Sequence, residues 1–525
     1  MIPFDWIVFL TMLCGLLAVA WWCRQRMRSV ADFVVVGRKM RKYLGLSTGT
    51  ADGIGLVSIA FIAEQGFHNG FAYVWLMLMS MVVKVPLFGI IGFGVRRFRA
   101  TRVQTIPQYH EMRYSRGVRI GVGITMAVGG ILNMAIFPLV SAHFLVTFMG
   151  LPTTLSILDC QIQTIHLCMI LLISISLSTA LMGGMVTVIV TDYLQSLVLA
   201  LSMFLIAVLI VMKIGLTGID ESLTTNLGQA AFNPFVADNI AGYGLVWILF
   251  FVMSDVLAPL SFPPSVAKLS STDNTDTVRK MVLLQFLFDK GRSMMILLWG
   301  IGAMAVLGAM APENIPETEW ARYASATFIR DISPIGLVGF CAAGLVFAYV
   351  TTDNSYYLSW SAIIVNDVVA PLRKTPLTQK QHLRLLRIIM TCIALFMLIW
   401  GMFFRLQETI FSYIMLTGTI FTAAGIITFV GLYWKRATSL GAYLAMGIGM
   451  AIPLADLIGK QIMEDAYPLK EHQSGLLTLV LAFLALGICG VCSKSGLAKW
   501  KNYGELVHLE DQQRRAARQS EAGHE

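Results

Sequence analysis

Long apolar runs, each near the thickness of a bilayer, follow one another along almost the whole chain. A hydrocarbon core of roughly 30 Å needs about 20 apolar residues in a helix. Thirteen runs meet that length: residues 5–23, 43–66, 70–95, 118–149, 163–182, 184–212, 241–262, 279–311, 334–368, 385–404, 409–433, 438–458 and 474–493. The pattern predicts an all-α membrane protein with about 13 transmembrane helices.

Two of these runs contain helix-breaking residues. The second run contains Gly53 and Gly55, and the seventh contains Pro259 and is followed directly by Pro263. Unwound backbone at membrane depth leaves polar groups without partners, so it is tolerated only where it lines a cavity or binds something. Interrupted helices at matching positions of two halves indicate an inverted-repeat transporter. Glycine also serves close helix packing in membranes, so each break taken singly leaves that alternative open.

The composition excludes an ordinary soluble domain, because 57% of the residues are hydrophobic and only 13% are charged. The net charge of +9 does not indicate nucleic-acid binding, because the basic residues lie mostly between the apolar runs. With the N-terminus outside, 30 of the 39 basic residues fall in segments expected on the cytoplasmic side. We therefore predict a multi-pass protein of the cell (inner) membrane with a cytoplasmic C-terminus.

The sequence contains no recognisable catalytic motif. There is no HExxH or GxSxG pattern, and the CxxC of Cys489 and Cys492 has neither a second pair nor a histidine cluster beside it. The eight cysteines lie almost entirely in apolar runs, where cysteine behaves as a small hydrophobic residue. We expect no enzyme activity and no resident metal.

Nine ionisable residues lie inside or at the rim of apolar runs, where each charge costs roughly 2.5–3.5 kcal/mol on insertion scales. They are Asp52, Glu64, Lys84, Asp192, Asp255, Asp289, Lys290, Arg292 and Asp353. Both signs occur, so some are expected to pair with each other and only hold the helices together. Glu64 lies near the outer end of its run, where contact with water is a simple alternative.

Five segments, in this order along the chain, resemble motifs of the sodium:solute symporter family. They are FVVVGR at 33–38, TIPQYHEMR at 105–113, GGMVTVIVTDYLQ at 183–195, AYVTTDNSYYLSWSAIIVND at 348–367 and GLYWKRATSLGA at 431–442. The third is the most specific, and the resemblance extends from about residue 30 to residue 450.

The resemblance implies a LeuT-like inverted repeat of five plus five helices, with broken first and sixth core helices. One extra span precedes the core and two follow it, which agrees with thirteen spans. The expected organisation is an N-terminal helix and linker (1–42), a first repeat (43–212), a second repeat (213–433), two C-terminal helices (434–493) and a cytoplasmic tail (494–525).

The resemblance also implies a sodium site between the first and eighth core helices. The expected ligands are the carbonyl oxygens of Ala51, Ile54 and Ala348 and the hydroxyls of Thr351 and Thr352. Oxygen ligands suit a hard monovalent cation, and neutral hydroxyls hold it weakly enough to release it. The alternative is that these threonines hydrogen-bond to their own helix carbonyls.

Three aspartates bear on the ion. By the resemblance, Asp192 lies on the inner exit route of the ion or holds a second ion; its alternative is a hydrogen bond to Thr191 or a neighbouring helix. Asp52 and Asp353 depart from the family pattern, because each directly follows an expected sodium ligand. A carboxylate there would raise sodium affinity, admit a proton or create another cation site.

The solute is expected at mid-membrane in this fold. The candidate residues by depth are Ser58, Met77, Asn133, Asp255 and Asp289, with Lys84 and Lys290 nearby. Basic groups bind carboxylates and acidic groups bind amines, which favours an organic anion or zwitterion over a sugar, unless Lys84 is neutralised by an aspartate.

We predict a secondary transporter that couples import of a small organic solute, such as a carboxylate or an amino acid, to sodium by alternating access. The alternatives are a proton-coupled symporter of the same fold and a membrane-embedded solute sensor. The expected partners are the solute, the co-transported sodium ion and membrane lipid, without nucleic acid, for a monomer or a loose homo-oligomer.

Overall fold

The chain folds almost entirely into helices. The computed structural model describes residues 1–24, 40, 42–157, 160–236, 244–312, 317–404, 410–463, 468–493, 497 and 500–522. The strands among these residues form one antiparallel hairpin, β1 (Thr154–Ile157) with β2 (Cys160–Gln163). The FVVVGR segment at 33–38 lies outside the described residues, and so does the side chain of Asp52.

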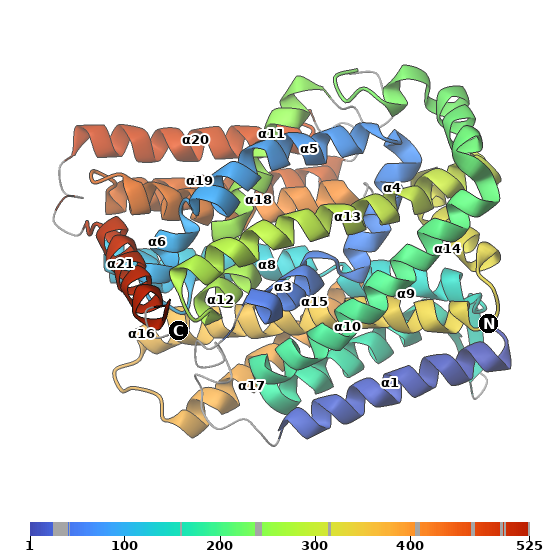
Figure 1. The fold of residues 1–525 in the computed structure, drawn as a ribbon, viewed down its shortest axis with the longest axis horizontal. Coiled ribbons are helices and arrows are strands. Elements are labelled where there is room, and N and C mark those ends of the chain that lie inside the picture. The colour runs from blue at the N-terminus through green and yellow to red at the C-terminus, as the bar shows by residue number, and fades with distance from the viewer. Residues whose placement is uncertain are drawn as a thin grey trace.

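The long helices run side by side as a bundle (Figure 1). Seven long helices are α1 (Pro3–Arg24), α10 (Thr164–Leu227), α13 (Thr275–Leu307), α17 (Gln379–Phe403), α18 (Ile410–Tyr433), α19 (Ser439–Met463) and α20 (Glu471–Cys492). α10 supplies two apolar stretches of spanning length, Thr164–Met182 and Thr187–Ala231, the second of which continues into the 3-10 turn that follows the helix.

Three further spans are built from consecutive shorter helices. They are α5 (Ala72–Lys84) with the π-helical turn η2 (Val85–Ile91) and α6 (Val95–Ala100), α8 (Arg116–Met134) with α9 (Phe137–Met149), and α15 (Leu337–Ile363) with the π-helical turn η4 (Ile364–Val369) and α16 (Ala370–Leu372). The described residues thus hold 11 helical runs long and apolar enough to cross a membrane.

Two bent helix pairs, each counted as one span, bring the number of spans among the described residues to 13. α3 (Lys42–Gly53) and α4 (Leu56–Asn69) meet at 63°, and α11 (Leu245–Ser261) and α12 (Pro263–Ser271) meet at 44°. At the first break Gly55 is extended, with φ −81° and ψ 171°. At the second, Pro263 excludes the helical conformation from the residue before it, and Phe262 is extended at ψ 107°. The predicted number of spans and the predicted broken helices are confirmed.

Several helices lie outside the apolar runs, where hydropathy gives no signal. They are α7 (Ile106–Arg113), the 3-10 turn η3 (Gly228–Ala231), α14 (Glu317–Ile332) and α21 (Tyr503–Ala522). α10 also continues to Leu227, beyond the predicted end at residue 212. The added part is too polar to read as a span but remains helical, with Gly215 at φ +75° within it.

The first and seventh core helices approach each other through glycine. A Cβ on Gly300 of α13 would lie 1.8 Å from the Ala63 carbonyl oxygen, and one on Gly66 of α4 would lie 2.2 Å from the Leu297 carbonyl oxygen. Neither position has room for a side chain, so the backbones of α4 and α13 touch. This contact holds α13 against the bent first core helix.

Two of the motifs quoted from the sequence meet at one end of the bundle. Arg113, at the end of α7, donates hydrogen bonds to the carbonyls of Gly431 (3.1 Å) and Trp434 (3.0 Å). His110 contacts Thr428 of α18 at 2.9 Å, and burial lowers the pKa of His110 to about 3. The TIPQYHEMR segment therefore fastens the short α7 to the end of α18, the tenth core helix.

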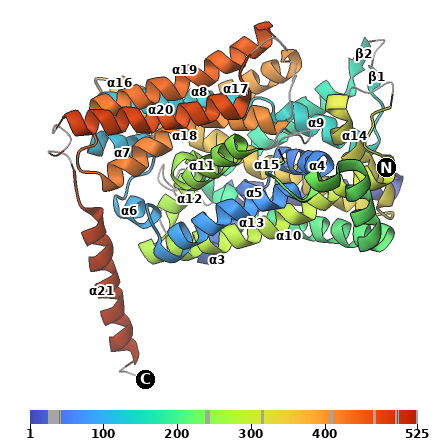
Figure 2. The same cartoon turned by 90° about the horizontal axis from the view of Figure 1, so that it is seen from above.

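The same end of the bundle carries α6, α16 and α21, and the opposite end carries Met1 (Figure 1). We call them the C-terminal end and the N-terminal end. α21 crosses the direction of the spans (Figure 2). It is tied to α6 by an ion pair in which the Arg96 Nη2 atom lies 2.6 Å from Oδ1 and 2.7 Å from Oδ2 of Asp511.

Candidate functional site

The break in the first core helix faces α15, the eighth core helix. α3 ends at Gly53, so the carbonyl of Ala51 is among those at a helix end that lack an intrahelical partner. The Thr351 hydroxyl lies 3.5 Å from this oxygen and also donates to the Ala348 carbonyl of its own helix at 3.1 Å. The expected ligand and the expected alternative, a back-bond to the helix, therefore coexist at Thr351.

The Thr352 hydroxyl lies against the second glycine of the break. A Cβ on Gly55 would come within 2.4 Å of the Thr352 Oγ1 atom, so only glycine leaves space here. Thr352 Oγ1 is buried and has no hydrogen-bond partner among the described residues. Ala51, Ile54 and Ala348 are each 1% exposed. The structure thus brings Ala51, Ala348 and Thr351 together, with Thr352 against the next glycine of the break, and Ile54 lies buried within the same break.

Asp192 is engaged on the C-terminal side of this junction. The Thr48 hydroxyl of α3 donates to its Oδ2 atom at 2.5 Å, and the Lys268 ammonium of α12 lies 3.3 Å from the same oxygen. Lys268 also donates to the Thr48 carbonyl. Asp192 therefore bonds to neighbouring helices, while Thr191 bonds back to its own helix at Thr187. The sequence did not single out Lys268, because a lysine five residues past a proline reads as a loop cation.

Two cavities flank the broken helices. The larger, about 330 Å³, lies between α3, α4, α5, α11, α12, α13 and α18, and its lining includes Met77, Lys84, Asp255, Asp289 and Lys290. The smaller, about 140 Å³, lies between α4, α8, α9 and α15, and its lining includes Ser58, Asn133, Thr352 and Asp353. The predicted solute residues are therefore divided between two chambers.

The two chambers are neighbours. Gly53, Phe61, Phe262 and Ile414 line both of them. Gly53 and Phe262 belong to the two helix breaks, so the unwound segments form part of the partition between the chambers.

Most of the charges in the larger chamber are paired. Lys84 contacts Asp255 at 2.8 Å, so the net charge that each would offer a solute is largely cancelled. Asp289 lies 3.5 Å from Arg292 and packs against the backbone of Gly53. Lys290 has no carboxylate within 4.0 Å in the described part of the chain, which leaves it as a cation facing this chamber.

Asn133 and Asp353 show opposite degrees of engagement in the smaller chamber. The Asn133 side-chain nitrogen donates to the Ile414 carbonyl (3.0 Å) and the Thr417 hydroxyl (2.9 Å), so it cross-links α8 to α18. Asp353 is fully buried, and the Ser176 hydroxyl lies 3.5 Å from its Oδ2 atom, a long contact for a hydrogen bond.

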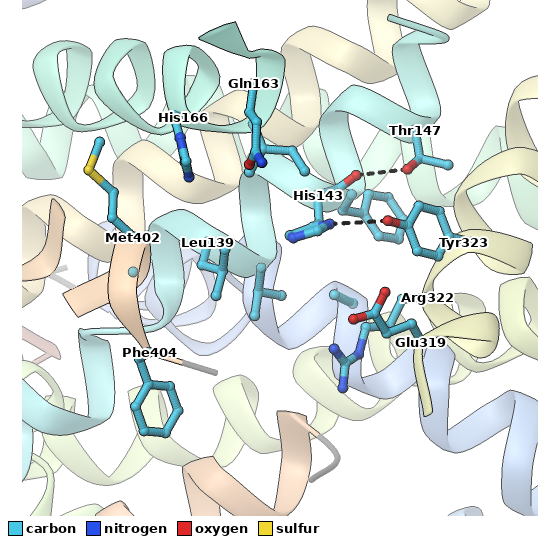
Figure 3. A pocket seen from close by; sticks show the side chains of 15 residues that line it. Leu139, His143, Thr147, Gln163, His166, Glu319, Arg322, Tyr323, Met402 and Phe404 are labelled. Atoms are coloured by element: carbon cyan, nitrogen blue, oxygen red, sulfur yellow. Dashed lines mark hydrogen bonds between the residues drawn. The ribbon is translucent and has the colours of Figure 1, made fainter. Parts of the chain in front are cut away.

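A third cavity, of about 380 Å³, lies near the N-terminal end and was not predicted (Figure 3). Figure 3 shows the His143 ring directed toward the Tyr323 hydroxyl, 3.5 Å away, beside Arg322 of α14. Arg322 pairs with Glu64 at 3.2 Å, and Glu64 is 0% exposed. The alternative of simple contact with water therefore does not describe Glu64, because α14 covers it and Arg322 pairs with it.

Comparisons with known proteins agree with this architecture. The profile of the sodium:solute symporter family matches residues 33–449. Two relatives are 20% identical: the sodium/sialic acid symporter SiaT of Proteus mirabilis (strain HI4320), over 87% of this chain and 90% of the relative, and NanT of Aliivibrio fischeri (strain ATCC 700601 / ES114), over 73% and 72%.

Solved structures share the fold. A Na+-coupled sialic acid symporter in a substrate-bound outward-open state superposes with a TM-score of 0.75 at 17% identity, over 93% of this chain and 98% of that chain. MhsT in complex with L-phenylalanine gives a TM-score of 0.52 at 12% identity, over 86% and 98%. The predicted LeuT-like fold is confirmed.

Proposed function

We propose that this chain, which belongs to the sodium:solute symporter family, carries a small organic carboxylate or zwitterion into the cell together with sodium. Family membership makes it a multi-pass transporter with sodium as the co-transported ion, and not an enzyme. The observation that carries the proposal is the approach of the Thr351 hydroxyl to the Ala51 carbonyl across the broken first core helix.

Sodium binds, in this proposal, between the carbonyls of Ala51, Ile54 and Ala348 and the hydroxyls of Thr351 and Thr352. The partial negative charge at the C-terminal end of α3 favours a cation at this point. The ion bridges α3 and α15, so its binding stabilises the arrangement in which these helices are close. Sodium and solute shift the transporter between its states only through their different affinities for those states.

The solute binds in the larger chamber, and Lys290 attracts its carboxylate. A volume of about 330 Å³ lies within the usual range for small-molecule pockets, roughly 300–1,000 Å³. The sialic acid that both named relatives transport is itself a carboxylate, which supports an acidic group on the solute. Asp289, beside the Gly53 backbone, links this chamber to the sodium junction.

The inner exit passes Asp192, and the N-terminal end faces outward. Support comes from the basic segments around α6, α16 and α21, which gather at the C-terminal end (Figure 1). Lys268 then holds the exit closed, because it joins α12 to both Asp192 and α3.

Sodium-gradient uptake by proteoliposomes tests the proposal. A panel of radiolabelled carboxylates, amino acids and sugars identifies the solute, and Thr351→Ala and Thr352→Ala test the site. Thr391→Ala is the matched control, because Thr391 is partly exposed on α17, away from the junction, and its hydroxyl bonds back to the Arg387 carbonyl at 3.0 Å. Sodium-independent uptake by the parent protein overturns the proposal.

A further inference from the structure

The smaller chamber contains a buried carboxylate that the sodium site does not require. Asp353 is 0% exposed, and its Oδ1 atom has no hydrogen-bond partner within the described ranges. No lysine, arginine or histidine of the described residues forms an ion pair with it. A buried carboxylate that has no paired cation and one oxygen without a hydrogen bond is costly, so this position selects for a ligand that supplies positive charge or hydrogen-bond donors.

One face of α15 presents further acceptor atoms to the same space. Tyr349, Thr352 and Asp353 follow the i, i+3, i+4 spacing that places side chains on one helix face, and all three line the smaller chamber. The hydroxyls of Tyr349 and Thr352 are buried and, like Asp353 Oδ1, have no hydrogen-bond partner in the part of the chain described. Three acceptor sites therefore lie in one small cavity.

Aromatic rings make up much of the remaining wall. Tyr356 lies 5.2 Å from Phe137 and 5.3 Å from Phe262, both measured between ring centroids, and Phe61 completes this part of the lining. Faces of aromatic rings attract organic cations, and a carboxylate inside such a cage is the chemistry that recognises ammonium groups. A bare sodium ion needs only a close shell of oxygens. The smaller chamber, at about 140 Å³, is several times larger than the roughly 30 Å³ that one water molecule occupies, so it has room for an organic group.

We propose that the smaller chamber binds the ammonium group of the transported solute, with Asp353 as its counter-ion. This inference rests on the proposed function and names the solute as a zwitterion, with its carboxylate on the Lys290 side of the shared partition. An ammonium has up to three N–H donors for Asp353, Thr352 and Tyr349. Thr352 also faces the sodium junction, so one hydroxyl links the ion to the solute.

Ligand binding to the purified protein tests the inference, measured as thermal stabilisation with and without sodium. The probes are the standard amino acids, glycine, β-alanine, γ-aminobutyrate and 5-aminovalerate, their N-trimethyl forms, the matching carboxylates without nitrogen, and a sialic acid. We expect sodium-dependent stabilisation only by probes that carry an ammonium group. Asp353→Asn should weaken their binding on the order of 100-fold, and Tyr349→Phe about 10-fold.

Asp456→Asn is the matched control, because Asp456 is also fully buried but lies on α19 and accepts a hydrogen bond from Ser474. It should leave the choice among probes unchanged. Tyr349→Phe keeps the test decisive if Asp353→Asn does not fold, since it removes one hydroxyl and no charge.

Failure of the inference and failure of symport give different results. If sodium drives uptake of a solute without an amine and no ammonium probe binds, the inference is overturned and the proposed function stands. If Asp353→Asn changes only the sodium concentration dependence, equally for all probes, Asp353 serves the ion and the inference is again overturned. If ammonium probes bind through Asp353 but no solute moves with sodium, the binding site stands and symport fails.

Discussion

Removal of the Lys268 ammonium should open the C-terminal end of the transporter. Lys268 is 1% exposed, pairs with Asp192 at 3.3 Å and donates to the Thr48 carbonyl, so it joins α12, α10 and α3. In Lys268→Met, an apolar side chain of similar length removes the cation and leaves the Asp192 carboxylate buried beside the Thr48 hydroxyl, which still donates to it.

The size of the effect follows from burial on both sides of the pair. Removal of one partner of a buried ion pair costs about 3–5 kcal/mol, whereas removal of both partners is often nearly neutral. A state in which water reaches Asp192 avoids that cost. At about 1.4 kcal/mol per factor of ten, the equilibrium should shift toward the open state by roughly 100-fold or more.

Cysteine labelling measures this shift directly. Ser265→Cys places a thiol on α12 in the lining of the larger chamber, in a background without the eight native cysteines. We expect Lys268→Met to accelerate labelling from the C-terminal end, and Asp192→Asn in the same protein to restore slow labelling. Lys280→Met is the control, because the Lys280–Asp276 pair is surface-exposed and worth about 0–1 kcal/mol. Unchanged labelling in Lys268→Met, or additive effects in the double variant, would refute the reasoning.

Three further outcomes follow from the structure. Gly55→Ala forces a Cβ within 2.4 Å of Thr352 Oγ1, so it should lower the free energy of unfolding by about 1–3 kcal/mol and lower the apparent sodium affinity. Gly447→Ala, whose Cβ meets open space, should do neither, and sodium titration of uptake decides between these outcomes. Lys84→Met should lower the free energy of unfolding by about 3–5 kcal/mol, because it leaves Asp255 buried without its cation, and Lys84→Met/Asp255→Asn should lower it by much less. A smaller loss in the single variant than in the double variant would contradict a buried pair. Burial lowers the pKa of His110 from 6.5 to about 3, so between these values the unfolded chain binds a proton that the folded chain does not. Stability should therefore decrease as the pH is lowered from 6.5 toward 3, by up to about 1.4 kcal/mol per pH unit, and His110→Gln should flatten that slope in thermal unfolding.

The span count and the two breaks could be predicted because they depend on local properties of the chain. An apolar run of sufficient length has few alternatives to a membrane helix, and Pro263 restricts Phe262 whatever surrounds it. The approach of Thr351 to Ala51, where we propose the sodium site, could be predicted only through the family motifs, since adjacent threonines in a membrane helix usually bond back to that helix. Thr351 does both.

That some of the buried charges pair could be predicted, but which ones pair could not, because it depends on which helices become neighbours. Lys84 and Asp255 are far apart in sequence but 2.8 Å apart in the fold. Glu64 is covered by α14, an amphipathic helix that no hydropathy run reveals. The division of the solute residues into two chambers likewise follows from the position of the unwound segments between them.

Measurement of sodium-driven uptake in the double variant Thr351→Ala/Thr352→Ala tests the central claim most directly. The parent protein should concentrate its solute only when a sodium gradient is imposed. The double variant, which lacks both hydroxyls opposite the Ala51 carbonyl, should lose that dependence while Thr391→Ala retains it. Full sodium-driven uptake by the double variant would contradict the site.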